Sequence, residues 1–127
     1  MKNGLLKIAL EGFDEGGQWV GFDLDGTLAK YDEWRGIEHI GEPIMEMVML
    51  VKKYLDEGTE VRIFTARCDQ PTDRESQAAI RYIKAWCLKY IGIELEVTNV
   101  KDHKMIKLYD DRAVTVVMNT GEVVEPA

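Results

Sequence analysis

The sequence is poor in the residues that mark several classes of protein. It has two cysteines and two histidines among 127 residues, and Cys68 and Cys87 lack metal-ligand spacing, which argues against a zinc module or a disulfide scaffold. No apolar run approaches the roughly 20 residues that span a bilayer, and Lys7 interrupts the early apolar stretch LLKIAL. We therefore expect no membrane span and no secretory segment, and the low cysteine content favours a reducing, cytoplasmic setting.

An excess of positive charge is also missing. Sixteen basic side chains stand against 23 acidic ones, for a net charge of -7. The field of such a molecule repels phosphate polymers unless a basic patch or a metal ion reverses it, which argues against tight nucleic-acid binding. The remaining composition is that of a globular protein, and we expect one domain over residues 1–127, with residues 1–18 as an N-terminal extension of ambiguous structure.

Short apolar runs alternate with amphipathic segments along the chain. The runs typical of buried strands lie at 19–22, 61–65, 95–100, 106–110 and 113–117. Between the third and fourth of these runs we expect a brief helix that begins at about Lys101. Strands that alternate with helices predict an α/β fold, a doubly wound and mainly parallel Rossmann-like sheet with helices on both faces.

Two longer helices are predicted from periodicity and end signals. The first begins near Pro43 and stops before Gly58. The second opens with Thr72 and Glu75, which have the spacing of a capping box, and stops near Gly92. Each would connect one strand to a parallel neighbour. The connections that remain are too short to hold a cap domain, so we expect none.

Polar residues follow the predicted strands where those strands end. Asp23 follows the first strand, Thr65 ends the second, Lys101 follows the third, and Asp110 and Asp111 close the fourth. The carboxyl ends of parallel strands share one edge of the sheet, where ligands bind in folds of this class. We therefore expect these segments to converge on one crevice.

Crowded carboxylates need a compensating cation. Asp23, Asp25, Asp110 and Asp111 would repel one another and raise one another's pKa values unless a hard divalent ion lay among them. Mg²⁺ fits best because it prefers carboxylate oxygens and keeps positions free for water and substrate phosphate. The sequence therefore predicts a magnesium site at the strand ends.

The same residues have the chemistry for phosphoryl transfer. Asp23 is placed to attack phosphorus, and Asp25 to protonate the leaving oxygen and later to take a proton from water. Thr65 and Lys101 would hold the phosphate oxygens, while Gly26 would let the backbone turn tightly beneath them. We prefer Lys101 to its neighbour Lys104 because Lys101 directly follows a strand.

Four short motifs carry a family resemblance. DLDGTLA, IFTAR, Lys101 and YDDR resemble, in their order, the four signatures of the haloacid dehalogenase-like (HAD) phosphohydrolases of the capless type, and they span residues 19–112. The resemblance implies a Mg²⁺-dependent phosphomonoester hydrolase that acts through an aspartyl phosphate. It also implies that Asp23 is the nucleophile and Asp25 the acid and base. The phosphate contacts would be Thr65, Ala66 and Lys101, and the metal ligands would be Asp23, Asp110, Asp111 and the main-chain carbonyl of Asp25.

Two other classes of protein share parts of this pattern. Bacterial receiver domains also combine acidic residues, Mg²⁺, threonine and lysine, but there the acidic pair closes the first strand, whereas here it comes last. A noncatalytic module that binds a phosphorylated ligand is the other alternative, and it is disfavoured because both Asp23 and Asp25 are present.

The substrate is less defined than the chemistry. The stretches RCDQPTDRESQAAIRYIKAWCLKYIGIEL and DGTLAKYD resemble the phosphatase domain of phage polynucleotide kinase, which implies a polynucleotide 3'-phosphatase or a nucleotidase as the alternative function. Arg35, Arg67 and Arg74 would then contact phosphates, although the acidic net charge argues against a polymer. Tyr31 and Trp34 are either core residues or a stacking platform above the site.

Overall fold

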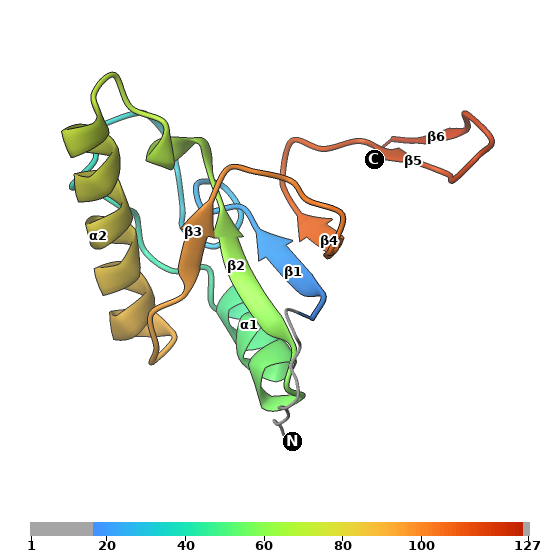
Figure 1. The fold of residues 1–127 in the computed structure, drawn as a ribbon, viewed down its shortest axis with the longest axis horizontal. Helices are drawn as coiled ribbons and strands as arrows, with labels where there is room; N and C mark the ends of the chain where they lie inside the picture. Colours follow the sequence, from blue (N-terminus) through green and yellow to red (C-terminus); the bar gives the residue numbers. More distant parts are fainter. Residues whose placement is uncertain (1–16, 126–127) are drawn as a thin grey trace.

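A four-stranded parallel sheet forms the centre of the structure (Figure 1). The structure is a computed structural model that describes residues 17–125. Along the sheet the strands run in the order β3-β2-β1-β4. Their bounds are Trp19–Phe22 for β1, Glu60–Phe64 for β2, Glu96–Thr98 for β3 and Met105–Tyr109 for β4. The predicted parallel, Rossmann-like α/β fold is confirmed.

Two α-helices connect the neighbouring strands. Helix α1 (Met45–Asp56) joins β1 to β2, while α2 (Asp73–Tyr90), preceded by the 3-10 helix η1 (Ala66–Cys68), joins β2 to β3. The hydroxyl of Thr72 accepts a hydrogen bond from the Glu75 amide at 3.1 Å, so Thr72 is the N-cap as predicted, and the Glu75 carboxylate accepts from that hydroxyl at 3.0 Å. Both predicted helices are therefore confirmed.

Both α-helices pack against the same face of the sheet. Val20 pairs with Val61 and Phe22 with Ile63, so these four buried side chains point to one side. They share one core with residues of α1 and α2, namely Val48, Val51, Ile83, Trp86 and Cys87. Right-handed crossovers that step twice in the same direction along a sheet place their helices on one face.

The opposite face differs from the expectation of helices on both faces. It is formed by the alternate residues Trp19, Gly21, Arg62 and Phe64, and within residues 17–125 no helix covers it. The Arg62 guanidinium lies 4.6 Å from the Trp19 ring centroid, and the Phe64 ring lies 6.5 Å from it. A helix would cover this face if it connected β3 to β4 across the sheet, but that connection is a short loop.

The brief helix expected from about Lys101 is wrong. Residues 99–104 form a loop, in which Asp102 accepts hydrogen bonds from the Lys104 amide and from the Trp19 indole, both at 2.9 Å. An aspartate that bonds to nearby backbone groups competes with helix formation, which explains the loop.

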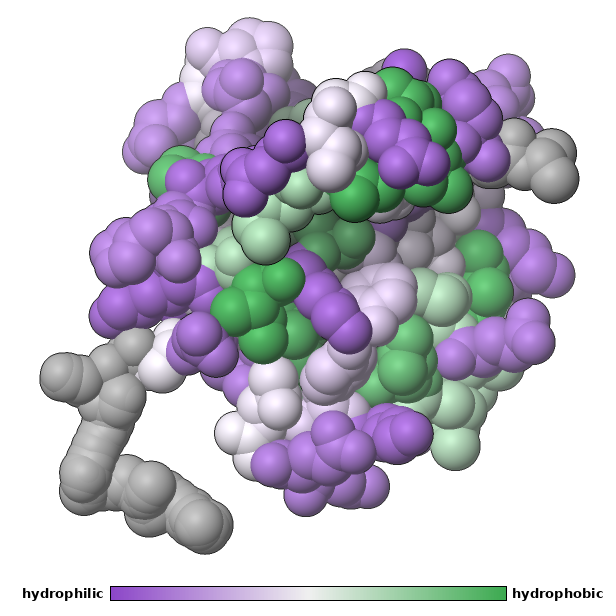
Figure 2. Space-filling model, turned by 90° about the vertical axis from the view of Figure 1, so that its right-hand side faces the viewer, coloured by the Kyte–Doolittle hydropathy of each residue, from purple (hydrophilic) through white to green (hydrophobic). Residues whose placement is uncertain are grey.

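The predicted strand at 113–117 does not join the sheet. Its central residues form β5 (Thr115–Val116), which pairs antiparallel with β6 (Val123–Val124) in a separate hairpin that projects from the body (Figure 1). The turn between them includes Asn119 at φ 67° and Gly121 at φ 77°, conformations that asparagine and glycine tolerate best. Figure 2, seen from the side on which the hairpin projects, shows hydrophobic residues beside hydrophilic ones at the surface.

The connections leave the carboxyl edge of the sheet uncovered by any cap domain in residues 17–125. The segment from 23 to 44 has no helix and only isolated bridges, and the Trp86 indole fastens it to α2 by donating to the Gly41 carbonyl at 3.0 Å. Within the described residues, neither α-helix has the length and apolar character needed to cross a membrane. Most of the expected N-terminal extension, residues 1–16, lies outside the described residues.

Candidate active site

Three carboxylates meet where β1 and β4 end. Asp23 follows β1, and Asp110 and Asp111 follow β4, its parallel neighbour. The Asp23 amide donates to the Tyr109 carbonyl at 2.9 Å, which continues the pairing of the strands to the edge itself. One oxygen from each of the three carboxylates lies within 4.8 Å of the others. This is a set of hard oxygen donors of the kind that Mg²⁺ requires.

The crowding perturbs Asp23. Its pKa is raised from an ordinary 3.8 to about 7, mainly because burial disfavours the charged form, and further because of the hydrogen bond with Asp111 and the negative charge of Asp110. Without a cation the cluster therefore holds a proton near neutral pH. A divalent ion would replace that proton and favour the ionised form.

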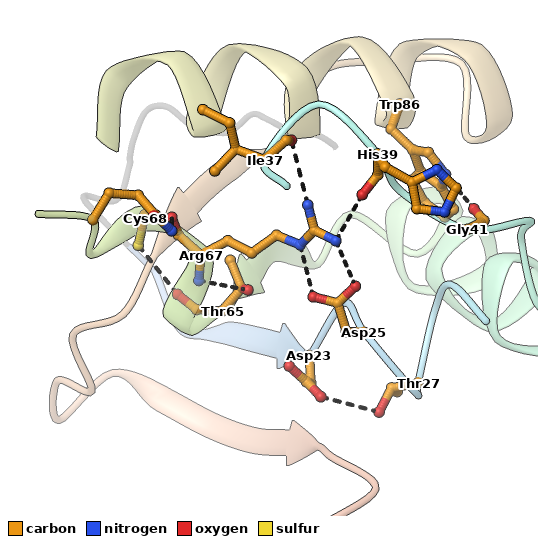
Figure 3. A network of polar contacts seen from close by, with 11 residues as sticks. Asp23, Asp25, Thr27, Ile37, His39, Gly41, Thr65, Arg67, Cys68 and Trp86 are labelled. Carbon is orange, nitrogen blue, oxygen red and sulfur yellow. Dashed lines mark hydrogen bonds and ion pairs between the residues drawn. The ribbon is translucent and has the colours of Figure 1, made fainter. Parts of the chain in front are cut away.

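Thr27 links the two ends of the acidic cluster, a role that sequence reasoning missed. Its buried hydroxyl donates to Asp111 Oδ1 at 3.2 Å and accepts from the Asp111 amide at 3.1 Å. It also lies 3.5 Å from Asp23 Oδ2 (Figure 3). The DLDGT motif contains this threonine four residues after Asp23, and that motif was the sequence signal from which its role could have been predicted.

Gly26 fits beneath Asp111. It adopts φ 89°, and a Cβ there would lie 2.7 Å from Asp111 Oδ2. Glycine is thus required both by the left-handed conformation and by the approach of a carboxylate. The predicted tight turn is present, and the group it accommodates in this structure is the side chain of Asp111.

Asp25 is held by Arg67. The guanidinium donates two hydrogen bonds to its carboxylate, from Nε at 2.7 Å and from Nη2 at 2.9 Å, and also bonds to the carbonyls of Ile37 and His39 at 3.4 and 2.9 Å (Figure 3). Arg67 is 5% exposed, so this paired geometry is shielded from water. The arginine therefore orients Asp25 and fastens the segment after β1 to the site.

Thr65 and Ala66 lie where β2 ends. The Thr65 amide donates to the Thr98 carbonyl at 2.9 Å, and its hydroxyl accepts from the Arg67 amide at 3.1 Å. This hydroxyl caps η1, and Thr65 is almost fully buried. It can still serve as a donor, because the hydrogen bond with Arg67 uses only a lone pair.

One cleft of about 610 Å³ unites these groups. The predicted residues that line it come from the three segments that follow β1, β2 and β4, and they are Asp23, Asp25, Tyr31, Trp34, Thr65, Ala66, Arg67, Asp110 and Asp111. Its size falls in the range of about 300–1,000 Å³ that small-molecule sites occupy. The cleft therefore has room for a phosphate group and for a further part of a substrate.

The predicted lysine is not brought into the cleft. Lys101 is exposed in the loop after β3 and does not line the cleft formed by residues 17–125. Lys104 lies at the other end of the sheet, because its carbonyl accepts a hydrogen bond from the amide of Trp19, the first residue of β1. Of the two lysines, only Lys101 follows the carboxyl end of a strand.

Two predicted arginines also lie apart from the cleft lining. Arg35 forms ion pairs with Asp32 at 2.8 Å and Glu33 at 3.3 Å, while Arg74 is exposed in the first turn of α2. Sequence reasoning instead missed Arg112 and Gln70, which do line the cleft. Arg112 directly follows the YDDR acidic pair, which was the available signal, whereas nothing near Gln70 in the sequence marks it.

Comparison with known proteins supports the fold. No family model and no curated protein matches this chain. Among solved structures, the chain is similar to a conserved protein coded by a locus of Bacteroides thetaiotaomicron, with a TM-score of 0.50 and 21% sequence identity over 77% of this chain and 78% of that one. At this identity the likeness concerns the fold alone.

Proposed function

We propose that this chain is a Mg²⁺-dependent phosphomonoester hydrolase of the haloacid dehalogenase-like type, which acts through an aspartyl phosphate. The observation that carries the proposal is the meeting of Asp23, Asp110 and Asp111 within 4.8 Å at the mouth of a cleft that also contains Asp25 and Thr65. A carboxylate nucleophile, a second carboxylate and a hard-cation donor set in one cleft are the requirements of this reaction.

The metal ligands would be Asp23, Asp110 and Asp111, with the main-chain carbonyl of Asp25. The donor set fits Mg²⁺ because it consists of oxygens. Burial, together with the neighbouring carboxylates, raises the pKa of Asp23 to about 7, and a cation would offset this cost to the charged form. When bound, Mg²⁺ supplies positive charge that draws the phosphate oxygens toward Asp23 and stabilises the charge that develops on them. Arg112, at the same edge, adds a second positive group.

The covalent steps fall to the two aspartates of DLDGT. An Asp23 oxygen attacks phosphorus, the bond from phosphorus to the ester oxygen breaks, and the leaving oxygen takes a proton from Asp25. Water then attacks the phosphorus of the aspartyl phosphate, Asp25 accepts its proton, and inorganic phosphate leaves as the Asp23 carboxylate is restored. The Thr65 hydroxyl would donate a hydrogen bond to a phosphate oxygen.

Arg67 constrains the proton transfer. Both Asp25 oxygens accept hydrogen bonds from it, so one of these bonds has to be given up when Asp25 carries a proton toward the leaving oxygen. The other bonds of Arg67, to the Ile37 and His39 carbonyls, keep the guanidinium in place during that exchange.

The test is phosphate release from a panel of phosphomonoesters with and without Mg²⁺. The panel includes sugar phosphates, nucleotides and 3'-phosphorylated oligonucleotides. Wild-type protein should release phosphate only with Mg²⁺, and Asp23→Asn and Asp25→Asn should each lose that activity. Asp56→Asn, which removes an exposed carboxylate at the end of α1, is the matched control and should match wild type. Metal-independent release, or full activity in Asp23→Asn, would refute the proposal.

A further inference from the structure

One tryptophan of the chain lies at the cleft wall with half of its side chain exposed. The sequence has three tryptophans, of which Trp19 and Trp86 are 0% and 7% exposed, whereas Trp34 is 50% exposed. Tyr31, three residues earlier, lines the same cleft and is also 50% exposed. Large aromatic side chains are usually mostly buried, so two such rings on one cleft wall indicate a surface that a ligand covers.

The Arg67 guanidinium packs against one face of the Trp34 ring. The Arg67 guanidinium carbon lies 4.8 Å from the ring centroid, within the range of a cation–π contact. Arg67 is itself nearly fully buried and is fixed by Asp25 and by the His39 carbonyl. The indole is therefore stacked on a rigid group, and a flat ligand that stacks on it does so with little loss of conformational freedom.

The same arginine connects this aromatic surface to the chemistry. Arg67 contacts Trp34 with its guanidinium while it pairs with Asp25, the proposed acid and base. A hydrogen-bonding side chain, Gln70, also lines the cleft. Its Nε2 donates to the Arg67 carbonyl at 2.8 Å, and among residues 17–125 the structure records no donor to its Oε1. Gln70 therefore offers an acceptor in the same cleft as the aromatic surface.

We infer that Tyr31 and Trp34 form a stacking site for a flat heteroaromatic ring at the far end of a small phosphomonoester, as in a nucleoside monophosphate. The inference rests on the proposed function, because the phosphate of this ligand is assigned to the Asp23 end of the cleft. A cleft of about 610 Å³ has room for both ends of such a ligand.

The charge distribution favours a small ester over a nucleic-acid end. The chain carries a net charge of -7, and the residues next to the aromatic pair include Asp32 and Glu33. Of the two cations that flank the aromatic pair in the sequence, Lys30 and Arg35, the second is neutralised by these two carboxylates. A polymer would bring further phosphates toward this acidic rim, whereas a mononucleotide brings one phosphate that lies at the metal.

The experiment measures binding separately from turnover. Calorimetric titration of Asp23→Asn protein in the presence of Mg²⁺ compares adenosine 5'-monophosphate, ribose 5-phosphate and a short 3'-phosphorylated oligonucleotide. The mononucleotide should bind roughly ten- to a hundredfold more tightly than ribose 5-phosphate, because stacking on an aromatic ring contributes an affinity of that order. It should also bind more tightly than the oligonucleotide. In protein that retains Trp34, binding of the mononucleotide should quench the fluorescence of this tryptophan, since the other two tryptophans are buried.

Variants of Trp34 provide the decisive comparison. Trp34→Ala should lower the affinity for the mononucleotide by roughly ten- to a hundredfold and leave that for ribose 5-phosphate unchanged, whereas Trp34→Phe, which keeps a ring, should retain most of it. Tyr82→Ala removes a comparably exposed aromatic ring on α2, outside the cleft lining, and should change neither affinity. Thermal unfolding checks that each variant is folded.

The outcomes separate this inference from the proposed function. Equal affinities for mononucleotide and ribose 5-phosphate, or an unchanged affinity in Trp34→Ala, would overturn the stacking site even if the protein hydrolyses phosphomonoesters. Tighter binding of the oligonucleotide would overturn the assignment to a small ester. Binding that depends on Trp34, in a protein whose wild-type form releases no phosphate, would support the stacking site and refute the hydrolase instead.

Discussion

The coupling between Mg²⁺, Asp23 and pH can be measured as stability. The folded-state pKa of Asp23, about 7, lies above its ordinary value of 3.8, so the metal-free folded protein holds a proton that the unfolded chain releases. This contribution to stability is fully present below pH 3.8 and is lost as pH rises through about 7. The metal-free protein should therefore become less stable across this window on account of Asp23.

The magnitude follows from the same pKa. The difference between 3.8 and about 7 corresponds to at most about 4 kcal/mol. Because Asp23 is only partly buried, solvent screening reduces this to about 1–2 kcal/mol. Mg²⁺ at about a hundred times its dissociation constant would add about 2.7 kcal/mol, or roughly 10 °C in Tm for a chain of this size.

The assay is thermal unfolding followed by circular dichroism. It is run with MgCl2 and with EDTA, at one pH below 7 and at one above it. The gain from Mg²⁺ should be larger above pH 7, where the cation no longer competes with a proton on Asp23. Asp110→Asn should lose most of the gain, and Asp56→Asn, outside the cluster, should keep it. The reasoning fails if Asp110→Asn is stabilised as strongly as wild type, or if the gain does not depend on pH.

Three further substitutions test the site. Asp23→Asn should lower turnover by at least about a thousandfold. It should also raise the Tm of the metal-free protein above pH 7, because it removes a negative charge that burial and the neighbouring Asp110 and Asp111 disfavour, and a lower Tm would contradict this origin of the raised pKa. Arg67→Ala should lower the free energy of unfolding in urea by about 3 kcal/mol, since it leaves a partly buried Asp25 without its partner, and Arg67→Lys should lose less. An effect below about 1 kcal/mol would mean that the pair is not fixed. Gly26→Ala should cost about 2 kcal/mol in the same assay and weaken Mg²⁺ binding, because its Cβ would displace Asp111; wild-type values for both would exclude that contact.

Local signals in the sequence were sufficient for the elements that carry the site. The capping-box spacing at Thr72 and the apolar runs at 19–22 and 61–65 predicted α2, β1 and β2, because caps and buried strands depend on residues close together in the chain. Once two strands are parallel neighbours, their carboxyl ends share an edge. The meeting of Asp23 with Asp110 was therefore predictable without coordinates.

Other features depend on contacts between distant residues, which only the tertiary structure decides. Arg67 reaches Asp25 across 42 positions and Thr27 reaches Asp111 across 84, and no local pattern indicates that either residue pairs with its partner. The position of the helices on one face followed from the strand order and from the absence of a helix between β3 and β4. The apolar run at 113–117 satisfied its hydrogen bonds with β6 rather than with the sheet, because a strand pairs with whichever edge its connections allow it to reach.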